Sequence, residues 1–298
     1  MNYLVVNSGK VTVDGAYIST ITIKGGGMVI NDVDTGLLSE EGNGSVNISI
    51  VSGRFESVVF DEYTFGKAIA SGSRIRLTDA DGGKIYKYAD IQNKGNAGVI
   101  VVEKCDHKDE NYNYELDGKP CPYCNEEIAA TVSYTTADGE NTDLFSDIYD
   151  AFAKANEIGT ATVTLYKDIT DDITDTIAVT GNVTLELNGK KLSTSGFDPY
   201  YAIEVKSGKL TVNGSGTIKC VVVRNGGDAE INGGIFSDFR IEDGGNAVIN
   251  GGKFNSIKVS GEGRNVGQLL ADGHAYKNFD GFWSTVAERE KQDIANVE

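Results

Sequence analysis

Apolar and polar residues alternate along residues 221–260, and this pattern repeats every 18 residues. Val221, Phe239 and Ile257 occupy one position of the repeat, and pairs of glycines separate its alternating stretches. Alternation is typical of strands with one buried face, and a short fixed period is typical of coils that stack to bury that face. Glycine accepts the positive φ values that corners between such strands need. The sequence therefore predicts an all-β fold, a right-handed parallel β-helix built as a solenoid.

The first part of the chain repeats the second part. Residues 7–15, NSGKVTVDG, match residues 206–214, KSGKLTVNG, and residues 65–72 match residues 266–273 in the same order. Matches that keep their order and spacing indicate two copies of one structural module. We therefore expect two tandem β-helix modules.

These matches define the expected domains. Residues 1–104 form the first β-helix module, residues 105–128 form a linker, and residues 129–298 form the second module. The first copy lacks the opening segment of the second, so we expect it to be N-terminally incomplete. The chain is thus interpreted as a monomeric fragment of a longer tandem-module protein.

An amphipathic segment opens the second module. Apolar residues recur at helical spacing within residues 142–157: Leu144, Ile148, Phe152 and Ala155. Thr142 or Asp143 can cap the N-terminus of this segment, and Gly159 can end it. Because the end coil of a solenoid exposes an apolar surface, the pattern predicts a capping helix over residues 142–157.

Composition and charge restrict the expected partners. The 298 residues include 37 glycines and only 3 prolines, and 44 acidic against 27 basic residues give a net charge of −17. This charge disfavours binding to nucleic acid or to anionic membranes. The sequence has no apolar stretch long enough to span a membrane, and a β pattern starts directly after Met1 without the pattern of a signal peptide. We expect neither a nucleic-acid partner nor membrane insertion.

Three of the four cysteines and one of the two histidines gather between the two copies. They form Cys105-x-His107 and, thirteen residues later, Cys121-x-x-Cys124. Three cysteines and a histidine at these spacings are a complete ligand set for a tetrahedral Zn²⁺ ion. Because no coordination position stays open, the sequence predicts a structural zinc site and no catalytic one.

Two other states of these cysteines remain open at this point. A disulfide would form if the protein is secreted, but it would leave one of the three cysteines unpaired. Thiols without metal or disulfide are the third possibility. Cys220 lies in an expected strand and is interpreted as a core residue, and a redox role for the Cys-x-x-Cys pair is disfavoured because no βαβ pattern surrounds it.

The remaining candidates are interpreted as structural. They are two groups of acidic residues near turns, one histidine and two aromatic pairs: Asp79 and Asp81; Asp168, Asp171, Asp172 and Asp175; His274; Tyr200-Tyr201 and Phe282-Trp283. The first group lacks the later ligands of a calcium loop, and the second is typical of a solvated turn. The histidine has no nucleophile beside it in the sequence, and the aromatic pairs are expected to pack. We predict no catalytic and no cofactor-binding residue.

The order of motifs resembles a known family. The cysteine and histidine pattern is followed by ATVTLYKDIT, VTLELNGKKL, SGKLTVNGSGTI, two copies of INGGxF and LLADGHAYKNFDG. This order resembles β-helical modules of large surface proteins of Gram-positive bacteria, including streptococcal choline-binding proteins and wall-anchored proteins of gut Firmicutes. The resemblance implies secretion, display on the cell surface, and a zinc knuckle at Cys105, His107, Cys121 and Cys124. Choline-binding aromatic repeats and a sorting signal are missing from the sequence.

These patterns lead to an expected function. We expect a non-enzymatic adhesin that contacts a host protein or glycan through exposed faces of a rigid solenoid. One alternative is a polysaccharide lyase or glycoside hydrolase, which would need a converging set of carboxylates that the two copies do not share. A second alternative is a structural stalk without its own ligand.

Overall fold

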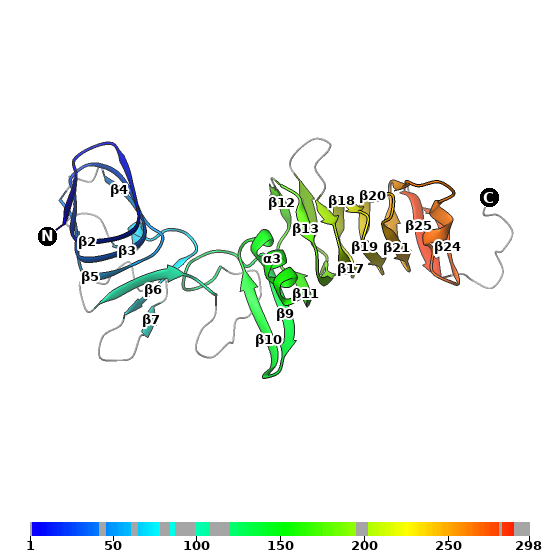
Figure 1. Ribbon diagram of the computed structural model, residues 1–298, viewed down its shortest axis with the longest axis horizontal. Helices are drawn as coiled ribbons and strands as arrows, with labels where there is room; N and C mark the ends of the chain where they lie inside the picture. Colours follow the sequence, from blue (N-terminus) through cyan, green and yellow to red (C-terminus); the bar gives the residue numbers. More distant parts are fainter. Residues whose placement is uncertain are drawn as a thin grey trace. The chain divides into compact units, whose positions relative to one another are not determined.

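The chain folds into two compact β-rich units (Figure 1). They are unit 1, Met1–Glu127, and unit 2, Ile128–Glu298. The computed structural model describes nine segments of the chain: residues 2–41, 46–60, 65–77, 84–86, 99–107, 120–173, 175–194, 202–279 and 282–288. Within each unit, strands from successive coils stack in parallel, so the predicted parallel β-helix is confirmed.

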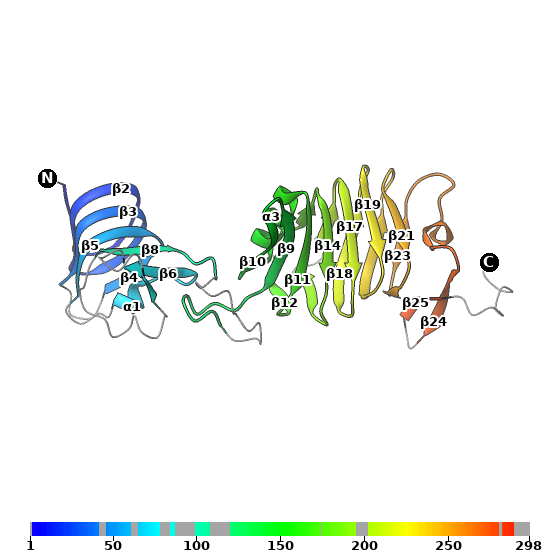
Figure 2. The same ribbon diagram turned by 90° about the horizontal axis from the view of Figure 1, so that it is seen from below.

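Unit 2 is built from two stacks of short strands. One stack contains β11 (Thr160–Leu165), β14 (Asn182–Glu186), β17 (Gly208–Asn213), β19 (Gly227–Ile231) and β21 (Asn246–Ile249). The other contains β12 (Ile169–Ile173), β13 (Ile177–Val179), β15 (Lys191–Thr194), β16 (Ile203–Val205), β18 (Thr217–Val223), β20 (Ile235–Ile241), β22 (Gly252–Phe254) and β23 (Ile257–Val259). The coils pass from one stack to the other (Figure 2). The buried apolar side chains of both stacks form the core of the unit.

The predicted repeat is the length of one coil. Val221 pairs with Phe239 and Phe239 pairs with Ile257, as the sequence alignment of the repeats predicts. The rings of Phe236 and Phe254, one repeat apart, stack with centroids 4.9 Å apart in the core. Each apolar position therefore forms a buried column that runs through successive coils.

The paired glycines have two different functions at the corners. Gly244 has a φ of 81°, which favours glycine. The neighbouring Gly245 has no such φ, but a Cβ atom there would lie 2.5 Å from the carbonyl oxygen of Val223 in the preceding coil. The first glycine is thus needed for the turn, and the second for the close approach of two coils.

A helix covers the first coil of unit 2, but it begins later than predicted. α3 spans Ile148–Ile158, and Asp147 caps it by accepting hydrogen bonds from the backbone N–H groups of Tyr149 and Asp150. Gly159 ends the helix in the left-handed conformation, as predicted.

The N-terminal part of the predicted helix 142–157 is wrong because this segment forms a strand. β10 (Gly139–Phe145) pairs antiparallel with β9 (Ala130–Thr136), and this pairing satisfies the backbone of residues 142–145. Leu144 therefore lies in a hairpin, although its spacing from Ile148 fits a helix.

Unit 1 has the same kind of coil with longer, continuous strands. Its parallel coils contain β1 (Tyr3–Val6), β2 (Lys10–Ile23), β3 (Gly26–Glu40), β4 (Val46–Ile50) and β5 (Gly53–Phe60). Val11, Met28 and Ile48 occupy equivalent positions in successive coils and face the core.

Both units end in the same arrangement of the chain. In unit 1, α1 (Phe65–Ala68) leads to a bridge between Ile50 and Ile69, and in unit 2 the 3-10 helix η1 (Val266–Leu269) leads to a bridge between Ile249 and Leu270. An antiparallel strand then closes the last coil: β8 (Ile100–Lys104) pairs with β5, and β25 (Phe282–Glu288) pairs with β22. We call this arrangement the closing cap.

Each closing cap contains one further strand that directly follows the bridge. It is β6 (Ser73–Leu77) in unit 1 and β24 (His274–Phe279) in unit 2. Unit 1 adds β7 (Lys84–Tyr86), which pairs with β6. The described residues of the predicted linker 105–128 are 105–107 and 120–128. All of them except Ile128 belong to unit 1, where they follow the closing cap, and Ile128 begins unit 2.

Candidate metal centre

The first two candidate ligands follow directly after the closing cap of unit 1. Cys105 is the residue after β8, and its backbone N–H donates to the carbonyl oxygen of Gly72 over 2.7 Å. His107 has a φ of 56°, which is uncommon for a residue other than glycine. Its backbone N–H points back to the sulfur of Cys105 at 3.3 Å. The Cys-x-His segment is therefore a tight turn that places both side chains on one side.

The other two candidate ligands lie on a second tight turn. The backbone N–H of Cys121 donates to the carbonyl oxygen of Glu126, and that of Asn125 donates to the carbonyl oxygen of Cys121, each over 2.7 Å. Asn125 follows Cys124 with a φ of 63°, in the conformation that asparagine tolerates better than most residues. This turn orients both sulfurs of the Cys-x-x-Cys pair toward the Cys-x-His segment.

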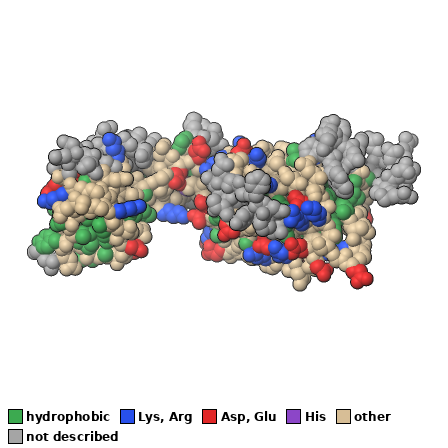
Figure 3. Space-filling view, turned by 90° about the horizontal axis from the view of Figure 1, so that it is seen from above, with side chains coloured by type: hydrophobic (Ala, Val, Ile, Leu, Met, Phe, Trp, Pro, Cys, Tyr) green, Lys and Arg blue, Asp and Glu red, His purple; other side chains and the backbone are tan. Residues whose placement is uncertain are grey.

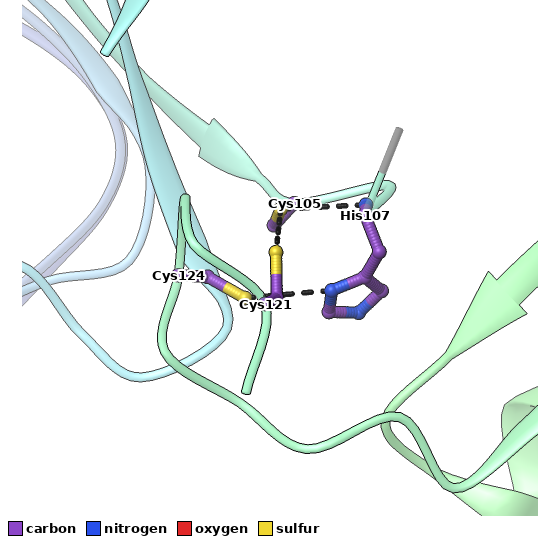
Figure 4. Close-up of side chains that lie close together, drawn as sticks. All are labelled: Cys105, His107, Cys121 and Cys124. Atoms are coloured by element: carbon purple, nitrogen blue, oxygen red, sulfur yellow. Dashed lines mark hydrogen bonds between the residues drawn. The ribbon is translucent and has the colours of Figure 1, made fainter. Parts of the chain in front are cut away.

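The two turns bring all four predicted ligands together (Figure 4). The donor atoms of Cys105, His107, Cys121 and Cys124 lie within 4.8 Å of one another, and all four residues are buried. The sulfurs of Cys105 and Cys121 are 3.8 Å apart, and the sulfur of Cys124 is 3.4 Å from Nδ1 of His107. Among the residues that the structure describes, this is the one cluster of His, Cys, Asp and Glu that could hold a metal ion.

These distances fit a tetrahedral site. With Zn–S bonds of about 2.3 Å and Zn–N bonds of about 2.0–2.1 Å, two sulfurs lie about 3.8 Å apart and a sulfur and a nitrogen about 3.6 Å apart. A disulfide requires sulfurs about 2.05 Å apart, and none of the four cysteines forms one in this structure. The donor set therefore matches a metal site and not a disulfide.

Burial and crowding disfavour ionisation of the thiols of Cys105 and Cys124. Hydrogen bonds with Cys121 and Cys124, together with burial, raise the pKa of Cys105. The hydrogen bond from Cys105 lowers the pKa of Cys124, but the hydrogen bond with Cys121 and burial outweigh it and raise that pKa to about 12. Three crowded, buried thiolates repel one another, and a bound divalent cation removes this repulsion.

Sequence reasoning missed Arg74, a charged residue beside the cluster. This residue of β6 donates from Nε to Oε1 of Glu103 over 2.7 Å and from Nη1 to Asp106, the residue between Cys105 and His107. Burial lowers the pKa of Arg74, but the hydrogen bond with Glu103 and the charges of Asp106, Glu103 and Cys105 outweigh it and raise the pKa. No local motif contains Arg74, because the contact depends on how β6 and β8 pair.

The remaining candidate residues are in structural roles where they are described. The carboxylate of Asp168 accepts a hydrogen bond from the backbone of Lys191, and that of Asp175 accepts one from the backbone of Thr176. His274 is the first residue of β24, and Cys220 is buried in β18. The other candidates lie outside the described residues or have side chains that are not described: Asp79, Asp81, Asp171, Asp172, Tyr200, Tyr201, Phe282 and Trp283.

Comparisons with known proteins provide no further constraint on the site. Protein-family models, curated proteins and solved structures give no significant match to this chain. Among the described residues, no helix has the length and apolar character needed to cross a membrane.

Proposed function

We propose that the chain is part of a bacterial surface adhesin whose unit 1 is held together by one structural Zn²⁺ ion. The observation that carries the metal assignment is the set of four buried donor atoms within 4.8 Å of one another. Three cysteines and one histidine use all four positions of a tetrahedral ion, so water and substrate have no place to bind.

The proposed ion cross-links two segments of the chain and has a structural function. When bound, Zn²⁺ supplies four bonds that join two segments separated by thirteen residues. Cys105 and His107 hold it from the end of β8, and Cys121 and Cys124 hold it from the second turn. The site thereby fixes the chain after the closing cap, where a free segment would otherwise fray from the last coil.

The proposed adhesive surface is the outer face of the stack that contains β11, β14 and β17. Thr162, Thr184 and Thr211 lie in one column across these strands, because each pairs with the next. They alternate with buried residues and therefore face outward, partly exposed. Strand spacing places such hydroxyl groups about 4.8 Å apart, a regular array suited to repeated hydrogen bonds with a glycan or an extended polypeptide.

Charged residues on the described surface support a non-enzymatic role. Acidic and basic side chains are interspersed on the face shown in Figure 3, and several form ion pairs. Glu204 and Glu242 both pair with Arg224, and Asp238 of β20 pairs with Lys258 of the next coil. Such pairs between neighbouring coils stabilise the stack, whereas polysaccharide cleavage needs carboxylates that converge on a substrate.

Two experiments test this proposal. Metal analysis of the purified chain is expected to give one zinc per chain, released by a chelator. For adhesion, the intact chain is applied to glycan arrays and to extracellular-matrix proteins, and binding is expected to be lost in Thr184→Lys/Thr211→Lys.

The matched control for adhesion is Thr217→Lys, which introduces the same side chain on β18 of the other stack. Equal binding by both lysine variants would contradict the proposed face. Cleavage of a polysaccharide by the chain would contradict the non-enzymatic assignment.

A further inference from the structure

Both halves of the metal centre are attached to one short turn of the closing cap. Ser71 donates from its hydroxyl to Oε1 of Glu126, on the Cys-x-x-Cys turn, over 2.9 Å. The carbonyl oxygen of Gly72 accepts from the backbone of Cys105, and Arg74 pairs with Asp106. Residues 71–74, which we call the anchor turn, therefore contact each ligand pair through a different set of groups.

Among the contacts of the anchor turn, the ion pairs of Arg74 are the most costly to remove. Its side chain is only 7% exposed, and a buried guanidinium is costly unless anions compensate its charge. Asp106 is 52% exposed and could be hydrated by water, yet its carboxylate pairs with Arg74. The pairing fixes Asp106, the residue between Cys105 and His107. The next residue, His107, adopts the uncommon positive φ. Such conformations persist when their surroundings determine them strongly.

Unit 2 provides an internal comparison for the anchor turn. In the closing cap of unit 1, Arg74 lies opposite Glu103 on the neighbouring strand. At the equivalent register of unit 2, Ala275 lies opposite Ala287. The cap of unit 2 forms with two alanines where the cap of unit 1 has the ion pair. The fold of the cap therefore does not require Arg74. The arginine is present in the unit that contains the four clustered ligands.

We propose that Arg74 is the positioning residue of the metal centre, which holds Asp106 so that Cys105 and His107 face Cys121 and Cys124 before the metal binds. This inference rests on the proposed zinc site and adds a residue that coordinates nothing itself. Its positive charge also offsets the negative charge of three thiolates around a divalent ion. Outer residues of this kind typically change metal affinity about 10–100-fold.

The decisive variant is Arg74→Ala, which introduces the alanine that unit 2 has at the equivalent position, Ala275. Zinc affinity is measured by competition with a chromogenic chelator on the intact chain, and we expect it to fall about 10–100-fold. The matched control is Arg76→Ala, because Arg76 pairs with the same Glu103 over 2.6 Å and has no ion pair with Asp106 in the structure. The control is expected to change zinc affinity less than about threefold.

Asp106→Asn and the double variant Arg74→Ala/Asp106→Asn test the coupling directly. If the two residues act through one contact, the double variant loses no more affinity than Arg74→Ala alone. Absorption of the cobalt-loaded chain reports the site itself, and Arg74→Ala is expected to weaken the bands of tetrahedral cobalt while Arg76→Ala retains them. Should Arg74→Ala fail to fold, Asp106→Asn alone is expected to show the loss of affinity.

Three results would overturn the inference. They are equal zinc affinity in Arg74→Ala and Arg76→Ala, additive losses in the double variant, and an unchanged affinity in Asp106→Asn. A native chain that binds no zinc would instead overturn the proposed function on which the inference rests. Native binding with an unaffected Arg74→Ala variant would remove the positioning role alone.

Discussion

The two closing caps share a backbone but differ in the side chains that secure it. In unit 1, Phe55 and Val102 lie on the antiparallel pair that closes the last coil, and Phe254 and Val286 lie on the equivalent pair of unit 2. Only the cap of unit 1 is followed, among described residues, by the four clustered ligands. Apolar positions and turns are therefore sufficient for the cap, and the metal centre is an addition with its own anchor.

The size of the core gives a reason for this addition. The described core of unit 2 extends over more coils than that of unit 1 and includes the buried face of α3. A smaller core buries less apolar surface and leaves less free energy of unfolding to spare. A structural metal is one of the few devices that compensates a small core. Four predictions test whether the two units depend on different interactions.

The largest effect is expected from removing the equivalent core rings. Phe55→Ala in unit 1 and Phe254→Ala in unit 2 should each lower the free energy of unfolding of their own unit by about 3–5 kcal/mol, because both rings are fully buried. Hydrogen exchange read separately on peptides of each unit checks this. If either variant destabilised both units equally, the division into two separate cores would be wrong.

The next effect is expected from removing one metal ligand. Cys121→Ser should abolish zinc binding, and with free zinc at 100 times Kd it should remove about 2.7 kcal/mol of stabilisation from unit 1. Unit 2 should keep its hydrogen-exchange protection. The control is Cys220→Ser, which replaces a buried cysteine of unit 2 and is expected to leave zinc binding unchanged. Loss of zinc in the control would contradict the assigned ligands.

A smaller effect is expected at α3, the helix that covers the first coil of unit 2. Asp147→Ala removes the side chain that accepts from two backbone N–H groups of α3 and should cost about 1 kcal/mol. Thermal unfolding followed by circular dichroism measures the change, and Asp147→Asn is the control that keeps the cap. A similar loss in both variants would show that charge, and not capping, is responsible.

The smallest effect is expected at an ion pair between coils of unit 2. Burial alone would raise the pKa of Glu204, but hydrogen bonds and charges of Arg224 and Lys206 outweigh it and lower the pKa. Its contribution is therefore present above the ordinary pKa of 4.5 and disappears as the pH falls through the lowered value.

The test of this ion pair is Glu204→Gln. The variant should lose up to about 1 kcal/mol at pH 7 and match the native chain at strongly acidic pH. Urea unfolding at several pH values measures both. A difference that grows on acidification would contradict the lowered pKa.

The parts of the structure that the sequence predicts are those with a local cause. The 18-residue period places Val221, Phe239 and Ile257 in one buried column, because alternation and coil length are properties of short segments. The four ligands are equally recognisable, since each pair lies within a few residues. The start of α3 was missed because the pairing of β10 with β9 outweighs a helical spacing of apolar residues.

Arg74 could not be predicted for a different reason. It reaches Asp106 across strands, and only the register of β6 against β8 brings them together. The equivalence of the two closing caps was likewise hidden, because the sequence match between residues 65–72 and 266–273 stops where β6 and β24 begin.

The most direct test of the metal centre is zinc X-ray absorption on the purified native chain. We predict one zinc per chain with three sulfur neighbours at about 2.3 Å and one nitrogen neighbour at about 2.0–2.1 Å. A chain without zinc, or a zinc ion surrounded mainly by oxygen atoms, would contradict this prediction.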